Sequence, residues 1–185
     1  MTKAELYARK HLSRDIDCIR NSDRNIELPN LTVYEKAVIY KYTEDGYENV
    51  NELLRSSKGT KSNEFASVLN NSLTKIDNYE GLVFRCADLN AFELEKYVKA
   101  EKEGIPITEY TFISTTKSEL TALAFGKNTK FVIYSKTGKE IEKISKFGKH
   151  NPPNEKEVLF KSGRSFNILE IIEESNQMVI TMEEV

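Results

Sequence analysis

The chain has 185 residues, of which 39% are hydrophobic and 30% are charged, and its formal net charge at pH 7 is −2. This composition predicts a folded chain and argues against a generic nucleic-acid binder, while no segment reaches the ~18 consecutive apolar residues of a membrane span. Because there are only two cysteines and two histidines, and because the N-terminus lacks the apolar core of a secretory signal, we expect no disulfide framework, structural zinc or signal peptide.

Helical patterns dominate the first 80 residues. Apolar side chains between Leu6 and Ile19 fall near one face of a first helix, and Thr32 and Glu35 form a capping box that opens a second helix. Asp45-Gly46 is a turn dipeptide, after which a short helix is expected. The most regular helical spacing of apolar residues runs over residues 65–76.

Strand patterns dominate the chain after Gly81. Asn90 and Glu93 open one further helix, which Gly104 ends. The expected strands are short runs rich in β-branched and aromatic residues, and they cover residues 82–87, 110–115, 130–134, 157–160, 166–172 and 178–182. Helices first and strands later predict a single α+β domain over residues 1–185. We expect it to consist of a helical lead-in (1–30), a helical part (31–80) and a strand-rich part (81–185).

Three polar features interrupt these apolar strands, and any chemistry is expected to come from them. Arg85 lies in the middle of a strand, where a buried guanidinium needs a carboxylate or an anionic ligand such as a phosphate; taken alone, a structural ion pair is the preferred interpretation. Ser114-Thr115-Thr116 ends a strand. Such hydroxyls commonly satisfy backbone groups, and the functional alternative is that one of them orients a catalytic group.

Glu155 and Glu157 lie two residues apart at the start of a strand and therefore share one of its faces. The two like charges raise the pKa of one carboxyl, although such pairs are also common on solvated faces. The loop before them (147–154) contains two prolines and displays Phe147, which is typical of loops that recognise a partner. An anion-binding arginine, an orienting hydroxyl and paired carboxylates suit N-glycosidic bond cleavage, because a carboxylate stabilises its oxocarbenium-like transition state.

The order of these motifs, Arg85, then Ser114-Thr115-Thr116, then Glu155-Lys156-Glu157, resembles the arginine–serine–glutamate class of mono-ADP-ribosyltransferases, which includes many bacterial toxins and some phage and eukaryotic enzymes. The Asn-x-x-Leu-Arg pattern of residues 51–55 also resembles the family, and the likeness covers about residues 31–173. It implies an α+β ADP-ribosyltransferase fold in which two packed, mostly antiparallel sheets form an NAD cleft and helices are concentrated in the N-terminal half.

The resemblance also implies NAD as a substrate, no metal, and a role for each matching residue. Arg85 is expected to bind the NAD phosphates and brace the cleft, and Asn51 and Arg55 to contact NAD as well. Ser114 is expected to hold Glu157 in position. Glu157 in turn would hydrogen-bond the nicotinamide ribose and stabilise the oxocarbenium ion as nicotinamide leaves.

Four further residues take roles from the same resemblance. Thr115 is grouped with the NAD-binding residues, and Phe125 takes the place of an aromatic that packs on nicotinamide, although a core position in a helix over 120–125 explains it equally well. Phe147 is expected to be the exposed aromatic of the substrate-recognition loop. Glu155 indicates an arginine acceptor, because a carboxylate can pair with a guanidinium and take its proton, which a glutamine cannot do.

The resulting prediction is an NAD-dependent protein-arginine mono-ADP-ribosyltransferase, either a bacterial toxin or effector or a phage enzyme. Its partner is a target protein, and we expect a monomer that binds neither nucleic acid nor membrane. One alternative is an NAD glycohydrolase that depletes NAD, and another is a non-catalytic NAD-binding module, against which the joint presence of Arg85, Ser114 and Glu157 argues. A third, ADP-ribosylation of nucleic acid, is disfavoured by the acidic pI and by Glu155.

The expected location follows from the missing signal peptide. We expect a soluble protein made in the cytoplasm and then secreted or delivered into a target cell, or one that acts in an infected host cytoplasm. A delivery partner or an immunity partner is left open.

Overall fold

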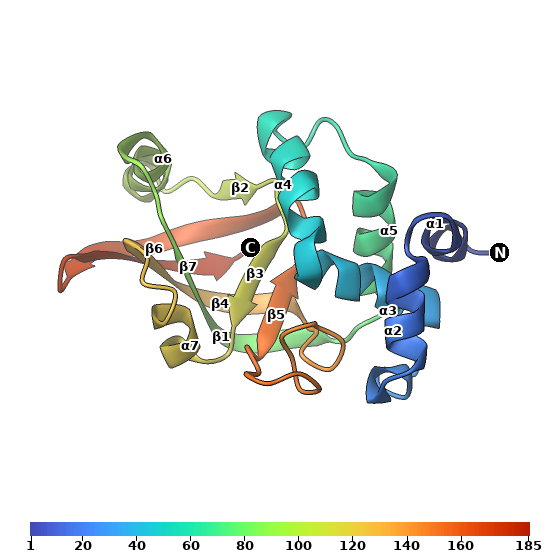
Figure 1. Ribbon diagram of the computed structural model, residues 1–185. Helices are drawn as coiled ribbons and strands as arrows, with labels where there is room; N and C mark the ends of the chain where they lie inside the picture. Colours follow the sequence, from blue (N-terminus) through green and yellow to red (C-terminus); the bar gives the residue numbers. More distant parts are fainter.

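The computed structural model describes residues 1–185 and places the helices of the N-terminal half beside a sheet formed by the rest of the chain (Figure 1). The N-terminal elements are α1 (Lys3–His11), α2 (Ser13–Arg20), the 3-10 turn η1 (Asp23–Asn25), α3 (Val33–Lys41), the π-helical turn η2 (Tyr42–Gly46), α4 (Tyr47–Ser56) and α5 (Glu64–Leu73). The later elements are β1 (Asn78–Ala87), α6 (Ala91–Glu103), β2 (Ile107–Glu109), β3 (Ile113–Thr116), α7 (Glu119–Leu123), β4 (Thr129–Glu140), β5 (Glu157–Phe160), β6 (Arg164–Glu174) and β7 (Gln177–Glu184). The predicted α+β class and the N-terminal concentration of helices are confirmed.

Two predicted helix starts are confirmed by their capping boxes. At α3, Thr32 Oγ1 accepts a hydrogen bond from the Glu35 backbone N–H (3.3 Å), and Glu35 Oε2 accepts one from the Thr32 N–H (2.9 Å). Asn90 and Glu93 form the same reciprocal pair at α6. The first predicted helix is instead divided at Leu12 (φ −128°, ψ 38°), because this buried side chain turns into the core shared by α1 and α2.

The turn expected at Asp45-Gly46 is not formed. Residues 42–46 instead form η2, which joins α3 directly to α4. A Cβ at Gly46 would lie 2.9 Å from the Lys41 carbonyl oxygen, so glycine allows the close approach that this widened turn requires. The continuous helical path carries α4 to the side of β3 (Figure 1).

The strands form one hydrogen-bonded network in the order β1-β3-β5-β4-β7-β6-β2, with a further pairing of β1 with β4. All neighbouring strands are antiparallel except β4 and β7, which are parallel. β4 joins the two expected sheets into one network, because it pairs with β1 along its length, with β7 over residues 129–134 and with β5 through Lys139 and Glu140 at its end. A bulge between Ser135 and Gly138 separates the part of β4 that pairs with β7 from the part that pairs with β5.

The predicted strand over residues 110–115 is only partly present. β3 begins at Ile113, and the backbone N–H of Phe112 is bonded to the Asn51 side chain of α4 rather than to a strand. The other predicted strands are all present, and most of them extend beyond the expected bounds.

Two groups of buried apolar side chains hold the elements together. The larger group comes from the N-terminal helices but includes Phe112, Ile144 and Leu159, so the helical and strand-rich parts share one core. The smaller group lies between the sheet and α6, which contributes Tyr97. None of the helices combines the length and the apolar character needed to cross a membrane.

Candidate active site

Glu157, the first residue of β5, is a buried carboxylate held by two hydroxyl groups. Its side chain is 5% exposed. Ser114 Oγ donates a hydrogen bond to Oε1 (2.6 Å), and Ser145 Oγ donates one to Oε2 (2.9 Å). Burial raises the pKa of Glu157 to about 6, although both serine hydrogen bonds act in the opposite direction. The carboxylate is therefore ionised at neutral pH but close to its titration range.

The three hydroxyl residues of β3 have separate roles. Antiparallel pairing places Thr115 opposite Val158 and Thr116 opposite Glu157, so Ser114 lies diagonally across from the carboxylate it contacts. Thr115 Oγ1 donates to the Val158 carbonyl (2.6 Å) and ties β3 to β5, which engages the hydroxyl expected to bind NAD. Thr116 Oγ1 accepts the Ser118 N–H ahead of α7 (3.0 Å). The two threonine hydroxyls thus satisfy backbone groups, as such hydroxyls commonly do, whereas the Ser114 hydroxyl orients the Glu157 carboxylate.

Arg85 of β1 is not engaged in the ion pair that is preferred from the sequence alone. Its Nη1 donates to the Ser114 carbonyl oxygen (2.9 Å), which links the arginine to the strand that presents the serine. The half-buried guanidinium lines two adjoining cavities. Its remaining N–H groups can therefore serve an anionic ligand.

The first cavity, of about 470 Å³, contains the residues of all three motifs. It is lined by residues of the N-terminal helices, β1, β3, the α7 region, the β4–β5 loop and β5, among them Asn51, Arg85, Ser114, Thr115, Phe125, Phe147, Glu155 and Glu157. All but one of the expected site residues are therefore brought together in one place.

Two aromatic residues and Glu155 form the rim of this cavity. Phe125 is 55% exposed, which rules out the core position considered for it. Phe147, 37% exposed, lies on the β4–β5 loop (residues 141–156), and its carbonyl accepts the Glu155 backbone N–H (2.9 Å). Burial raises the pKa of the half-buried Glu155 carboxyl. The loop thus presents an apolar ring and a carboxylate side by side.

Asn51 lines the same cavity but uses its amide inside the protein. Its Oδ1 accepts the Phe112 N–H (3.0 Å), and its Nδ2 lies within hydrogen-bond distance of the Phe112 carbonyl (3.4 Å) and the Tyr42 hydroxyl (3.3 Å). Complete burial raises the pKa of Tyr42. Asn51 thus fixes the start of β3, and its contact with NAD stays a prediction.

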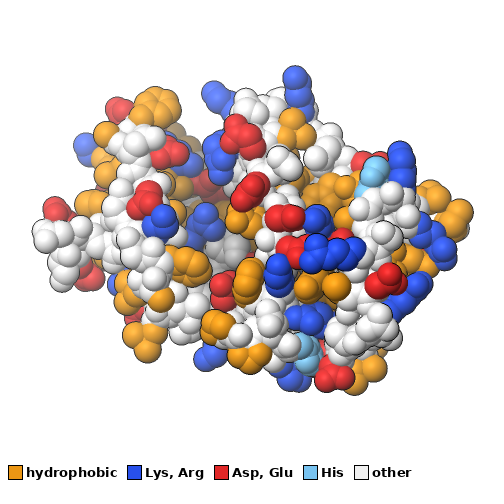
Figure 2. Space-filling model, in the orientation of Figure 1, with side chains coloured by type: hydrophobic (Ala, Val, Ile, Leu, Met, Phe, Trp, Pro, Cys, Tyr) orange, Lys and Arg blue, Asp and Glu red, His pale blue; other side chains and the backbone are white.

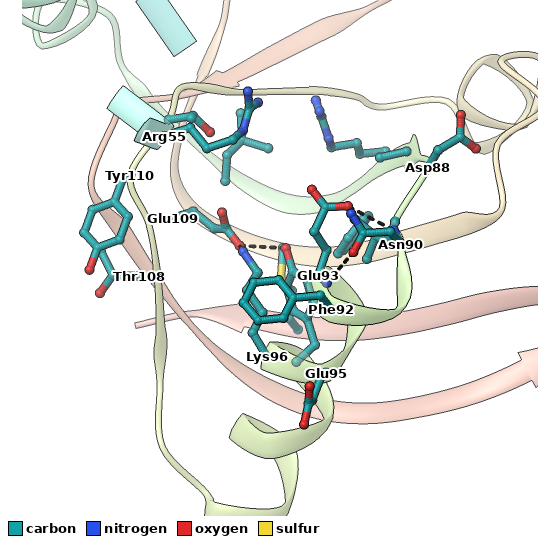
Figure 3. Close-up of a pocket in the computed structure, with 18 of the residues that line it drawn as sticks. Arg55, Asp88, Asn90, Phe92, Glu93, Glu95, Lys96, Thr108, Glu109 and Tyr110 are labelled. Atoms are coloured by element: carbon teal, nitrogen blue, oxygen red, sulfur yellow. Dashed lines mark hydrogen bonds and ion pairs between the residues drawn. The ribbon is translucent and has the colours of Figure 1, made fainter. Parts of the chain in front are cut away.

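Arg55 is the expected site residue that lies elsewhere. It forms an exposed ion pair with Glu52 (3.2 Å) and lines a second cavity of about 780 Å³. The surface is hollowed between α6 and α4 at this place (Figure 2), and Arg55 stands across the hollow from Asp88, Asn90 and Phe92 (Figure 3). Because Arg85 lines both cavities, the two adjoin at the arginine.

Sequence reasoning missed Ser145. This serine lies in a loop of irregular structure, 12 residues before the carboxylate it contacts, and no spacing rule links the two. The contact between Ser145 and Glu157 depends on how the β4–β5 loop folds back on β5, and the local sequence does not encode that path. No group of three His, Cys, Asp or Glu side chains is arranged to hold a metal ion.

Comparisons with known proteins agree with this geometry. Residues 20–185 match the family model of the ADP-ribosyltransferase exoenzymes. The NAD(+)–arginine ADP-ribosyltransferase Mav of Mycobacterium avium (strain 104) is 33% identical over 165 residues, which are 88% of this chain and 19% of Mav. The NAD(+)–protein-arginine ADP-ribosyltransferase Tre1 of Pseudomonas putida (strain GB-1) is 28% identical over 77% of this chain and 27% of Tre1. The chain therefore spans only about a fifth to a quarter of these relatives.

Solved structures show the same fold. The ADP-ribosyltransferase HopU1 of Pseudomonas syringae pv. tomato DC3000 superposes with a TM-score of 0.75 at 20% identity, over 92% of this chain and 86% of HopU1. Exoenzyme S of Pseudomonas aeruginosa, solved with human 14-3-3 protein beta and carba-NAD, gives a TM-score of 0.76 at 19% identity, over 99% and 87%. The predicted fold is thus confirmed, and with the match over residues 20–185 the chain belongs to the ADP-ribosyltransferase exoenzyme family.

Proposed function

We propose that this domain transfers ADP-ribose from NAD to the guanidinium of an arginine side chain in a target protein and releases nicotinamide. The observation that carries the proposal is the Glu157 carboxylate, buried and bonded to Ser114 in a cavity whose rim bears Glu155. Family membership and the names of the two curated relatives support it.

The two adjoining cavities suit a dinucleotide that bends around Arg85. The guanidinium can bind the pyrophosphate through paired N–H groups, with the nicotinamide half beside Glu157 and the adenosine half in the larger cavity. Phe125 on the rim offers a ring on which nicotinamide can pack. In this arrangement the negative charge of Glu157 lies next to the nicotinamide ribose, where positive charge develops as the glycosidic bond breaks.

Glu155 gives the acceptor its chemistry. The bond between C1′ of the ribose and the nicotinamide nitrogen breaks, and its electron pair leaves on nicotinamide. A guanidinium nitrogen then forms the new bond to C1′, and its proton passes to Glu155, whose carboxyl binds protons more readily because burial raises its pKa. Phe147, on the same loop, is positioned to contact the protein that carries the arginine.

The fold is also that of secreted effectors. The type III effector XopAI of Xanthomonas axonopodis pv. citri superposes with a TM-score of 0.71 at 22% identity, over 98% of this chain. This likeness supports a toxin or effector that acts inside a target cell.

The proposal is tested by following nicotinamide release from NAD with and without agmatine, a small guanidinium acceptor. We expect the wild type to form ADP-ribosyl-agmatine, Glu157→Ala to lose both release and transfer, and Glu155→Ala to lose transfer while keeping release. Glu173→Ala, which removes an exposed carboxylate from β6, is the matched control and should behave as wild type. Nicotinamide release without an agmatine product would indicate an NAD glycohydrolase, and the absence of any NAD turnover would overturn the proposal.

A further inference from the structure

The second hydroxyl bound to Glu157 comes from a residue outside the family motifs. Ser145 is 1% exposed, and its hydroxyl bonds Oε2 while that of Ser114 bonds Oε1. The terminal torsion of a glutamate side chain is broad, so a single hydrogen bond leaves the carboxylate plane free to turn. Donors on both oxygens fix that plane and leave further lone pairs for a ligand hydroxyl.

The turn that carries Ser145 is attached to Glu157 by its backbone as well. The Ile141 N–H donates to the Glu157 carbonyl (3.0 Å), and the Ser145 N–H donates to the Ile141 carbonyl (2.8 Å). The Lys149 N–H closes the turn on the Glu142 carbonyl (2.8 Å). Ser145 is thus held in a short closed turn that follows β4 and is hydrogen-bonded to the first residue of β5.

A buried arginine from the N-terminal segment holds the other side of this turn. Arg24 of η1 is 8% exposed, and its guanidinium donates to the carbonyls of Ile144 (Nε, 3.1 Å) and Ser145 (Nη2, 3.2 Å). It also lies over the ring of Tyr40 at 5.2 Å. Since a buried cation is costly unless its N–H groups are bonded, these carbonyls are the groups that satisfy Arg24.

A cluster of charged side chains on the surface also joins the N-terminal segment to the β4–β5 loop. Glu27, three residues after Arg24, forms ion pairs with Lys149 (3.0 Å) and Lys143 (3.8 Å) and contacts His150 (3.2 Å). Residues 24–27 therefore hold the β4–β5 loop both from its buried side and from its surface.

We propose that Ser145 is a positioning residue for Glu157 and that Arg24 holds Ser145 in place, so that the N-terminal segment sets the geometry of the catalytic carboxylate. The kinetic consequence rests on the proposed function, whereas the effect on the carboxylate itself does not. The charged or titratable groups that face Glu157 are Arg85 from β1, Glu155 from the loop and Tyr42 from η2, and none of them changes in a Ser145 variant.

The direct test is a carbon-13 NMR titration of the glutamate carboxyls in the free protein, with the Glu157 signal assigned by its loss in Glu157→Gln. Because the Ser145 hydroxyl stabilises the ionised form, Ser145→Ala should move the Glu157 midpoint upward from near 6 by about one pH unit. Ser72→Ala is the matched control, since Ser72 is also fully buried and bonds only the Val68 carbonyl. An unmoved midpoint in Ser145→Ala overturns the inference.

The role of Arg24 is tested by a double-mutant cycle. Arg24→Lys keeps the charge but loses the forked contact with the two carbonyls, and should raise the Glu157 midpoint in the wild-type background and not in Ser145→Ala. An equal rise in both backgrounds shows that Arg24 does not act through Ser145 and overturns that part.

Kinetics provide the second readout. The acid limb of nicotinamide release should move with the NMR midpoint, so that Ser145→Ala loses most of its rate at pH 6. Above pH 8 a smaller loss should remain, because the carboxylate plane is no longer fixed, while Ser72→Ala follows the wild type. A rate that equals the wild type's at every pH contradicts a positioning role. If the wild type turns over no NAD, the proposed function fails, and the NMR titration still decides the inference on Ser145.

Discussion

Asn51 of α4 bonds both peptide groups of Phe112, accepting its N–H at 3.0 Å and reaching its carbonyl oxygen at 3.4 Å. The side-chain amide thus supplies the two hydrogen bonds that a neighbouring strand would make with Phe112, the residue before β3. Ser114 follows two residues later and donates to Glu157. A helix side chain therefore fixes the start of the strand that presents the serine to the carboxylate.

Asn51→Ala is expected to act on stability and on turnover rather than on NAD binding. Phe112 is buried, and the loss of the amide leaves its backbone groups without partners, which costs about 1–3 kcal/mol of unfolding free energy. Urea unfolding measures this loss, and steady-state kinetics should show kcat falling with little change in the KM for NAD. Glu48→Ala, an exposed change in the same helix, is the control. A large rise in KM with unchanged stability would show instead that Asn51 contacts NAD directly.

Features whose determinants are local are predicted correctly from the sequence. The capping boxes at Thr32 and Asn90 and the apolar spacing of α5 act within one or two helical turns, and the structure contains all three. Arg85, Ser114 and Glu157 could be proposed because each interrupts an apolar strand. Strand pairing brings these three residues together in one cavity. The sequence does not show that pairing directly, and the order of the motifs along the chain is the only sign of it.

The features that could not be predicted from the sequence depend on contacts between distant segments. The π-helical turn replaces the turn expected at Asp45-Gly46, because the course of the chain there depends on the close approach of the Lys41 carbonyl to Gly46 and not on turn propensity. The contact of Arg24 with the Ser145 carbonyl spans 121 residues, and no local pattern announces it.

Glu157→Gln is expected to stabilise the fold in a pH-dependent way. Burial raises the pKa of Glu157 from its ordinary 4.5 to about 6, so its ionisation weakens the folded state. The wild type therefore loses stability as pH rises from about 4.5 through about 6, by up to about 2 kcal/mol, and gains none of it back above that range. Urea unfolding at pH 8 should give the variant a free energy of unfolding higher than the wild type's by that amount, and the difference should vanish at pH 4. Glu173→Gln is the exposed control, and an advantage that is equal at both pH values would contradict this account.

Arg85→Lys is expected to weaken NAD binding more than Arg55→Lys does. Lysine keeps the charge of Arg85 but loses both the fork that suits a pyrophosphate and the bond to the Ser114 carbonyl. Since hydrogen bonds to charged groups contribute about 1.5–3 kcal/mol, the KM for NAD should rise about 10- to 100-fold. Arg55 has an exposed ion pair with Glu52, and its replacement should change KM about threefold at most. Equal effects of the two changes would mean that Arg85 is not the main phosphate ligand.

Gly148→Ala should disrupt the β4–β5 loop and with it the candidate active site. A Cβ at Gly148 would lie 1.9 Å from the Glu142 carbonyl oxygen, so the backbone of the turn beside Ser145 must shift. Backbone is less able to yield than a flexible side chain, and we expect a loss of about 2 kcal/mol or more in unfolding free energy. Gly104→Ala provides the contrast, because its Cβ would meet nothing within 4 Å and only the left-handed backbone (φ 62°) opposes it, at about 1 kcal/mol. Nicotinamide release should fall in Gly148→Ala and remain at the wild-type level in Gly104→Ala. If Gly148→Ala kept full turnover, the closed turn could not be what holds the Ser145 hydroxyl on Glu157.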